Sequence, residues 1–307
     1  MGIFYMGEFM KKYYHGTQQH GPYFEGWYFK FQTKDGKSIA LIPALHMDET
    51  NQKSASLQII SNKKTWWLEF PETAFHASQD VFEIRIGQTI FTEREVLLHI
   101  EQPGISLQGK LQFGIFTPLP SDIMGPFRFI PRMECSHSVI SMAHTLDGTL
   151  TLNDEKMDFS GGMGYIEGDR GRSFPNAYLW TQCMWQDVQY HSIMLSIATI
   201  PIGKWNFHGC IGVIFHEGKQ YRLATYRGAR ITQWSWNGAE ICQGNYRLTV
   251  KVLQEQAHPL RAPVQGNMQR TIHESLCAKV RYRFWIKNRL VLEHIDDCAS
   301  FEYTDSM

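Results

Sequence analysis

The chain has 307 residues, and its 30 Lys and Arg residues balance its 30 Asp and Glu residues, so its formal net charge is zero. This balance argues against a nucleic acid as the main partner, because phosphate binding needs an excess of basic residues. Aromatic residues make up 13% of the chain and charged residues 20%, a composition that excludes intrinsic disorder. The length suits two domains or one large β domain.

Several kinds of segment are not expected. The longest apolar run, residues 193–202, contains polar residues and a proline and is shorter than the roughly 20 apolar residues of a membrane-spanning helix. Residues 1–14 lack the order of basic and apolar residues that marks a signal peptide. The six cysteines form no CxxC motif, which predicts reduced thiols in a cytoplasmic or membrane-peripheral protein.

Short segments with alternating side chains dominate the chain. We count about 18–20 of them, bounded by turn residues, and find no sustained helical periodicity. This pattern predicts an all-β fold, a barrel or a sandwich, with mostly antiparallel pairing. A charged stretch with glycines, Asn153–Gly162, is the expected break between two halves, each large enough for a barrel around one small ligand. Clear strand predictions are Tyr23–Phe31, Phe82–Ile86, Ser106–Phe113, Tyr246–Leu253 and Ala278–Ile286.

The stretch from Gly161 to Gln182 gathers charged residues between apolar flanks. In an extended strand, Tyr165, Glu167 and Asp169 point to one face and Arg170 to the other. Two carboxyl groups this close raise the pKa of one of them, which keeps an acid protonated near neutral pH. The alternative is a surface loop of salt bridges. The apolar run at 178–185 that follows favours a buried strand instead.

Two earlier segments carry further candidates. In His20–Lys30, Glu25 shares a strand face with aromatic residues, so it is a barrel-mouth residue, a buried acid that needs a partner, or a solvated residue at a strand end. In Gly125–Met142, Glu134, Cys135 and His137 would need more ligands to hold a metal, so hydrogen-bonded residues at a pocket rim are favoured and no metal is predicted. The chain contains neither GxSxG nor GxGxxG, which argues against a hydrolase elbow and a dinucleotide loop.

These three blocks, together with TYRGARI at 225–231, resemble the tocopherol cyclase family in its short bacterial form, over about residues 15–305. The block that contains Glu167 and Asp169 departs from the family pattern, because Gly168 replaces Lys and Arg170 replaces Trp. It also resembles, more distantly, a motif of carotenoid hydratases. The resemblance implies two lipocalin-like antiparallel β-barrel or sandwich domains, 15–158 and 159–307. It further implies a reaction without cofactor, in which an acid protonates a prenyl C=C bond and a phenol oxygen closes a chroman ring.

The resemblance also implies roles for individual residues. Asp169 is the expected proton donor and Glu167 the neighbour that raises its pKa, with Tyr165 beside them. Arg172 is placed to hold one of these two carboxylates, which would lower its pKa. The cation would be met by aromatic faces and the head group oriented by polar residues. The expected substrate-binding residues are Glu25, Trp27, Tyr28, Glu134, His137, Arg170, Arg172, Trp180 and Gln182.

Other functions stay open at this stage. A lipocalin-like barrel can also carry an apolar small molecule without changing it, since a fold does not fix a function. Addition of water in place of the phenol oxygen would make the protein an isoprenoid hydratase. A stress or cell-surface interaction protein is a third class, with no specific residue behind it. In the first two cases the partner is an apolar small molecule, and the sequence predicts no oligomeric state.

Overall fold

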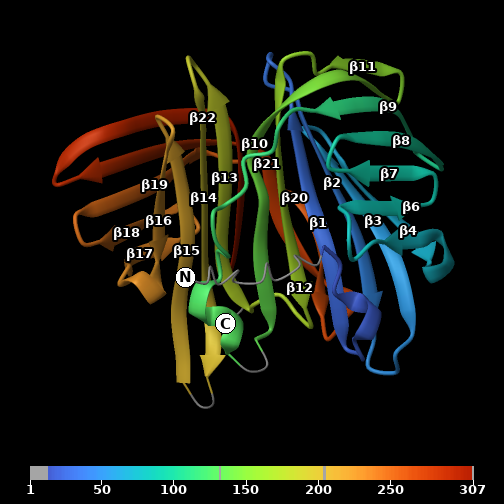
Figure 1. Ribbon diagram of the computed structural model, residues 1–307, viewed down its shortest axis with the longest axis horizontal. Coiled ribbons are helices and arrows are strands. Elements are labelled where there is room, and N and C mark those ends of the chain that lie inside the picture. The colour runs from blue at the N-terminus through green and yellow to red at the C-terminus, as the bar shows by residue number, and fades with distance from the viewer. Residues whose placement is uncertain (1–12, 131–132, 203–204, 306–307) are drawn as a thin grey trace, which may run out of the picture.

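The computed structural model describes residues 13–130, 133–202 and 205–305 and contains 22 strands in two antiparallel sheets (Figure 1). This confirms the predicted all-β, antiparallel fold. Helical structure in the described part is limited to short 3-10 turns, and no helix there is long and apolar enough to cross a membrane. These turns are η1 (Gly16–Gln18), η2 (Glu72–Ala74), η3 (Gly125–Phe129) and η4 (Thr225–Arg227).

The first sheet has 12 strands in the order β4-β3-β2-β1-β12-β10-β9-β8-β7-β6-β5, with β11 paired to β10. Its middle strands, β1, β12 and β10, come from the three sequence blocks singled out above. The strands are β1 (Tyr23–Gln32), β2 (Ser38–Met47), β3 (Lys53–Ser61), β4 (Thr65–Pro71), β5 (Phe75–Ala77), β6 (Glu83–Ile86), β7 (Thr89–Thr92), β8 (Glu95–Gln102), β9 (Ile105–Phe113), β10 (Cys135–Leu152), β11 (Glu155–Asp158) and β12 (Gly162–Gly171).

The second sheet has 10 strands in the order β16-β15-β14-β13-β22-β21-β19-β18-β17, with β20 paired to β21. The strands are β13 (Ala177–Gln186), β14 (Tyr190–Ile202), β15 (Trp205–His216), β16 (Lys219–Ala224), β17 (Arg230–Ser235), β18 (Gly238–Gln243), β19 (Tyr246–Gln254), β20 (His258–Val264), β21 (Asn267–Ile286) and β22 (Arg289–Asp305). The predicted division at 158 and 159 stays a prediction about domains, while sheet membership changes between Gly171 and Ala177.

The molecule has three apolar cores, one inside each curved sheet and one between the sheets. Because side chains alternate along a strand, the middle strands supply two cores at once. On β1, Trp27 and Phe29 enter the core of the first sheet, whereas Tyr28 enters the core between the sheets. This burial on both faces explains why β1 is buried along most of its length. The two sheets lie side by side with these strands in the middle (Figure 1).

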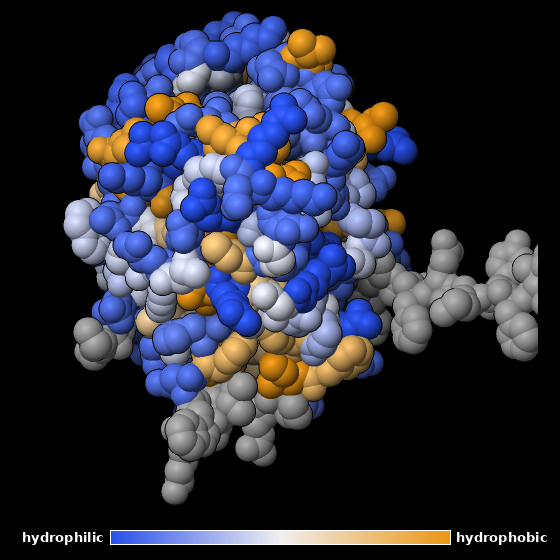
Figure 2. All heavy atoms as spheres, turned by 90° about the vertical axis from the view of Figure 1, so that its left-hand side faces the viewer, coloured by the Kyte–Doolittle hydropathy of each residue, from blue (hydrophilic) through white to orange (hydrophobic). Residues whose placement is uncertain are grey.

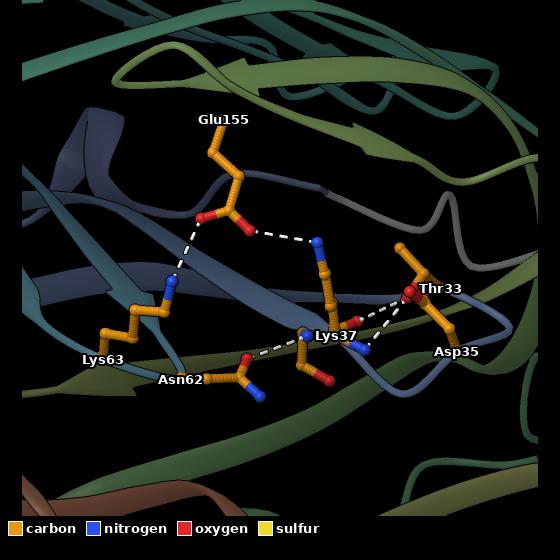
Figure 3. A network of polar contacts seen from close by, with 7 residues as sticks. Thr33, Asp35, Lys37, Asn62, Lys63 and Glu155 are labelled. Atoms are coloured by element: carbon orange, nitrogen blue, oxygen red, sulfur yellow. Dashed lines mark hydrogen bonds and ion pairs between the residues drawn. The ribbon is translucent and has the colours of Figure 1, made fainter.

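The outer parts of the molecule are polar. Glu155 of β11 accepts hydrogen bonds from Lys37 at 3.0 Å and Lys63 at 3.2 Å and so joins two turns at one end of the first sheet (Figure 3). The face on the side of the second sheet is mostly hydrophilic, with dispersed apolar residues (Figure 2). The apolar surroundings that a small hydrophobic ligand needs are found instead in the core between the two sheets.

Candidate functional site

A cavity of about 650 Å³ lies between the two sheets. This volume is in the range of small-molecule sites. Six aromatic side chains line it, namely Phe24, Tyr28, Phe127, Phe174, Tyr178 and Trp180. Nine acidic, basic or histidine residues share that lining, namely His46, Glu134, His137, Glu167, Asp169, Arg172, Arg261, Glu274 and Glu302. The cavity is therefore an aromatic chamber with few, concentrated polar groups.

The first-sheet wall of the cavity is built from neighbouring strands. In the antiparallel register, Tyr28 of β1 lies opposite Glu167 of β12, and Asp169 of β12 lies opposite His137 of β10. Tyr165, Glu167 and Asp169 follow one another at every second position of β12, so their side chains share the face between the sheets, as predicted. With His137 they form what we call the first-sheet cluster.

His137 joins the two carboxylates of this cluster. Its Nδ1 lies 2.9 Å from Asp169 Oδ1, a hydrogen bond, and its Nε2 lies 3.3 Å from Glu167 Oε2, an ion-pair distance. Glu167 also accepts hydrogen bonds from the Tyr165 hydroxyl at 2.5 Å and from the Trp180 indole at 3.3 Å. Burial lowers the pKa of His137, but the charges of Glu167 and Asp169 outweigh it and raise that pKa well above its usual value. The imidazole is therefore positively charged at neutral pH.

The second-sheet wall carries two more carboxyl groups, Glu274 of β21 and Glu302 of β22, which lie directly opposite each other in the sheet. They are 2% and 6% exposed. Glu274 accepts a hydrogen bond from the Tyr28 hydroxyl at 2.6 Å, and Glu302 accepts one from the Tyr178 hydroxyl. Among the described residues, neither group forms an ion pair. We call them the second-sheet acids.

Burial sets the protonation of the second-sheet acids. It raises the pKa of Glu274 to about 8, with a smaller contribution from the charge of Glu167 and partial opposition from the Tyr28 hydrogen bond. Burial, together with the charge of Glu274, also raises the pKa of Glu302 well above its usual value. For both groups the pKa shift favours the neutral carboxylic acid, on the wall opposite the first-sheet cluster.

The first-sheet cluster also has the donor set of a metal site. The ligand atoms of His137, Glu167 and Asp169 lie within 4.8 Å of one another. Imidazole and carboxylate are ligands that Zn²⁺ accepts. A proton on His137 and a divalent cation would compete for the same lone pairs, so one excludes the other.

The structure separates the residues predicted from the sequence into two groups. Seven line the cavity, namely Tyr28, Glu134, His137, Glu167, Asp169, Arg172 and Trp180, and fully buried Tyr165 lies behind Glu167. In the described part of the chain, Arg172 forms no ion pair with Glu167 or Asp169 and its buried Nε has no hydrogen-bond partner, so its guanidinium is available to a polar group of a ligand.

The other four predicted residues lie away from the cavity lining. Trp27 packs in the core of the first sheet. Glu25 is satisfied by His15, whose Nδ1 lies 2.8 Å from Oε1, and by the Tyr23 hydroxyl at 2.8 Å. Arg170 lies opposite Glu25 in the register and so faces away from Asp169, as predicted. Gln182 is fully buried, and neither of its side-chain amide atoms has a hydrogen-bond partner among the described residues.

Gly168 and Arg170, the two departures from the family pattern, do not lie on the cavity wall. Gly168 and Arg170 alternate with Glu167 and Asp169, so they point to the opposite face of β12. A Cβ atom added at Gly168 would lie 3.2 Å from Trp27 Cδ1 and 3.3 Å from Ser138 Oγ, which is tight packing. The glycine therefore fits the core of the first sheet, and the acids keep their place at the cavity.

Sequence reasoning missed the second-sheet acids. One pattern could have found Glu274, since it shares a strand face with Ile272 and Leu276, and a carboxyl group on an apolar face requires an explanation. The same pattern singled out Glu25, which turned out to be held by local partners. Distinguishing the two cases needs the contact between Tyr28 and Glu274, which are 246 residues apart in the chain.

Comparison with known proteins agrees with this architecture. The profile of the family described as tocopherol cyclase-like matches residues 106–304. The chain belongs to that family. A comparison of the chain with curated protein sequences found no match.

Solved structures with low sequence identity share the fold of this tocopherol cyclase-like protein. CghA, solved with Sch210972, has 10% identity and a TM-score of 0.59, covering 92% of this chain and 88% of its own. Kievitone hydratase from Nectria haematococca has 9% identity and a TM-score of 0.54, covering 94% and 93%. A putative AttH from Nitrosomonas europaea has 12% identity and a TM-score of 0.52, covering 91% of both chains.

Proposed function

We propose that the protein is an enzyme that starts a reaction by protonating a C=C bond of an apolar substrate in the cavity between the sheets, without a cofactor. The substrate we propose is a prenylated quinol or a related isoprenoid, and the product a chroman-type ring. The observation that carries the proposal is geometric: on one wall of an aromatic cavity two carboxyl groups are held by phenols, and on the opposite wall two are held by His137. Membership of the tocopherol cyclase-like family supports it.

The surroundings suit this chemistry. Protonation of an alkene creates a tertiary cation, which the faces of aromatic rings attract. The rings of Tyr28 and Trp180 pack edge to face, with their centroids 5.2 Å apart. They lie beside Glu167 and Glu274. Arg172 is available for a hydroxyl or carbonyl oxygen of the head group.

The role of Asp169 as proton donor stays a prediction. Its hydrogen bond to His137 supports another role, because an imidazole and a carboxyl group in contact can share a proton taken from the substrate. In the proposal, Glu167 and Asp169 therefore receive the proton that the attacking hydroxyl group releases, and Tyr165 and His137 orient them.

The test uses deuterated water. The protein is incubated with a reduced prenyl-benzoquinol in D₂O, followed by chromatography and mass spectrometry. Cyclisation is an isomerisation, so we expect a product of different retention that carries one deuterium on carbon, because the proton added to the alkene comes from an exchangeable acid. A product heavier by one water would identify a hydratase instead.

The second candidate function is ligand carriage, which the cavity of about 650 Å³ alone would also allow. Under that function the quinol binds, protects the protein from unfolding and is recovered unchanged. Binding with no product from any prenylated quinol or isoprenoid olefin would overturn the enzymatic proposal.

A further inference from the structure

The two walls of the cavity differ in what their carboxyl groups contact. Each carboxylate of the first-sheet cluster lies within 3.3 Å of a nitrogen of His137, which supplies positive charge. The second-sheet acids contact phenols, and in the described part of the chain no Lys, Arg or His forms an ion pair with them. A buried carboxyl group without a countercharge is stable in its neutral form. Geometry alone thus places the available proton on the second sheet.

We propose that Glu274 is the proton donor of the reaction and that the first-sheet cluster is the acceptor on the opposite wall. This assignment rests on the proposed function and deepens it. It gives the substrate a direction in the cavity, with its C=C bond toward β21 and its hydroxyl-bearing ring toward β12 and β10. The substrate class is therefore a molecule in which the hydroxyl oxygen can reach the alkene carbon, while the alkene faces Glu274 and the hydroxyl proton faces the first-sheet cluster.

Glu274 fits the role of donor better than its neighbour Glu302 does. The Tyr28 hydroxyl holds Glu274 beside the Tyr28 and Trp180 rings, where a cation would be stabilised. Its pKa of about 8 is close to neutral pH, the range in which a general acid works best. Glu302 also has a cation near it, because Arg270 lies 5.8 Å from the ring of its partner Tyr178 and lowers the pKa of Glu302.

Charged and titratable groups from several elements surround Glu274. The charge of Glu167 raises its pKa, and that of Lys30 lowers it. Lys30 is fully buried and donates a hydrogen bond to the carbonyl of Cys298 at 2.6 Å. The neighbours of Glu274 are Tyr28 and Lys30 of β1, Glu167 of β12, His258 of β20 and Glu302 of β22.

The step balances without an oxidant or reductant. The Glu274 O–H bond breaks as a C–H bond forms on the alkene, which leaves a tertiary cation and a Glu274 carboxylate. The substrate hydroxyl oxygen then forms the C–O bond, and its proton passes to Glu167 or Asp169. One proton has moved from the second wall to the first, and exchange with solvent restores both groups before the next turnover.

The experiment compares Glu274→Gln with the wild-type protein and with the control Glu293→Gln, which removes a surface carboxylate that accepts a hydrogen bond from Arg283 at 2.7 Å on the same sheet. Turnover of the prenyl-benzoquinol is measured in D₂O. Affinity is measured for the same quinol with a saturated side chain. We expect Glu274→Gln to lower kcat by about 10²–10⁴-fold, as for loss of a general acid, while affinity for the saturated quinol changes little.

A second variant keeps the assignment testable if Glu274→Gln does not fold. Tyr28→Phe retains the acid but removes a hydrogen bond that lowers the pKa of Glu274. The alkaline limb of its pH–rate profile should therefore move to higher pH than in the wild type. A Glu274→Gln variant that forms the deuterated product at the wild-type rate, or an unmoved limb in Tyr28→Phe, overturns the assignment alone. Absence of turnover in the wild type overturns the proposed function and the assignment with it.

Discussion

The first-sheet wall and the second-sheet wall each present two carboxyl groups to the same cavity. On the first wall His137 lies between Glu167 and Asp169, and its own pKa is raised well above the usual value by their charges. On the second wall phenols are the hydrogen-bond partners, and burial raises the pKa of Glu274 to about 8. The comparison teaches that the partner of a buried carboxyl group, and not its burial alone, decides whether it carries charge.

The largest expected effect concerns stability as a function of pH. Because the pKa of Glu274 rises from 4.5 to about 8 on folding, its contribution to stability is complete below pH 4.5 and is lost as the pH rises to 8. The loss is on the order of 4 kcal/mol. Glu274→Gln should remove this part of the pH dependence, as measured by urea unfolding between pH 4.5 and 8.5. Parallel curves for the two proteins would show that Glu274 is ionised in the folded state.

The next effect concerns the first wall. His137→Gln leaves Glu167 and Asp169 without their positive partner, and breaking a buried ion pair in this way costs roughly 3 kcal/mol. Urea unfolding at pH 7 should show this loss, and Asp169→Asn added to the same protein should restore part of it. The control is His99→Gln on an exposed position of β8, which should leave stability nearly unchanged. An equal loss in both single variants would contradict the charged state of the cluster.

A smaller effect concerns metal ions. If a proton occupies His137 during turnover, dialysis against a chelator should leave the rate unchanged. Zn²⁺ should slow the reaction by competing for the same three side chains. The slowing should weaken below pH 6, where protons compete better, and should disappear in the His137→Gln background. A rate that falls on chelation and returns with metal would replace the protonated cluster with a metal centre.

The smallest effect is expected at an ion pair in water. Lys63 is 80% exposed and contacts Glu155 at 3.2 Å (Figure 3). Solvent screens such a pair, so Lys63→Ala should leave the urea midpoint within experimental error. A clear loss of stability would mean that an exposed charge pair contributes as much to the free energy of unfolding as a pair at the cavity.

Much of the fold could be predicted from alternation. The segment Tyr23–Phe31 predicts β1 almost to the residue, and Ala278–Ile286 forms the second half of β21. Alternation also placed Tyr165, Glu167 and Asp169 on one face of β12. It could not tell which face of a middle strand meets the cavity, because both faces are buried. For that reason Glu25 and Trp27 were expected at the ligand, although the structure turns them toward the first sheet.

The second wall could not be predicted because its partners are remote in the chain. Alternation in residues 267–286 places Glu274 on an apolar strand face beside Ile272 and Leu276, but the same pattern also occurs at Glu25, so it does not reveal a reactive acid. Its environment comes from Tyr28, Lys30 and Glu167, which reach it only when the two sheets pack. The acid of the reaction is thus a property of the interface between the sheets.

The most direct test of the account is the protonation of Glu274 in the folded protein. Carboxyl ¹³C NMR of protein labelled at glutamate, titrated from pH 4 to 10, resolves each buried group, and Glu274→Gln assigns its resonance. We predict a glutamate resonance that titrates near pH 8 in the wild type and is missing in the variant. A Glu274 resonance that titrates near its ordinary pKa of 4.5 would contradict the assignment of the donor.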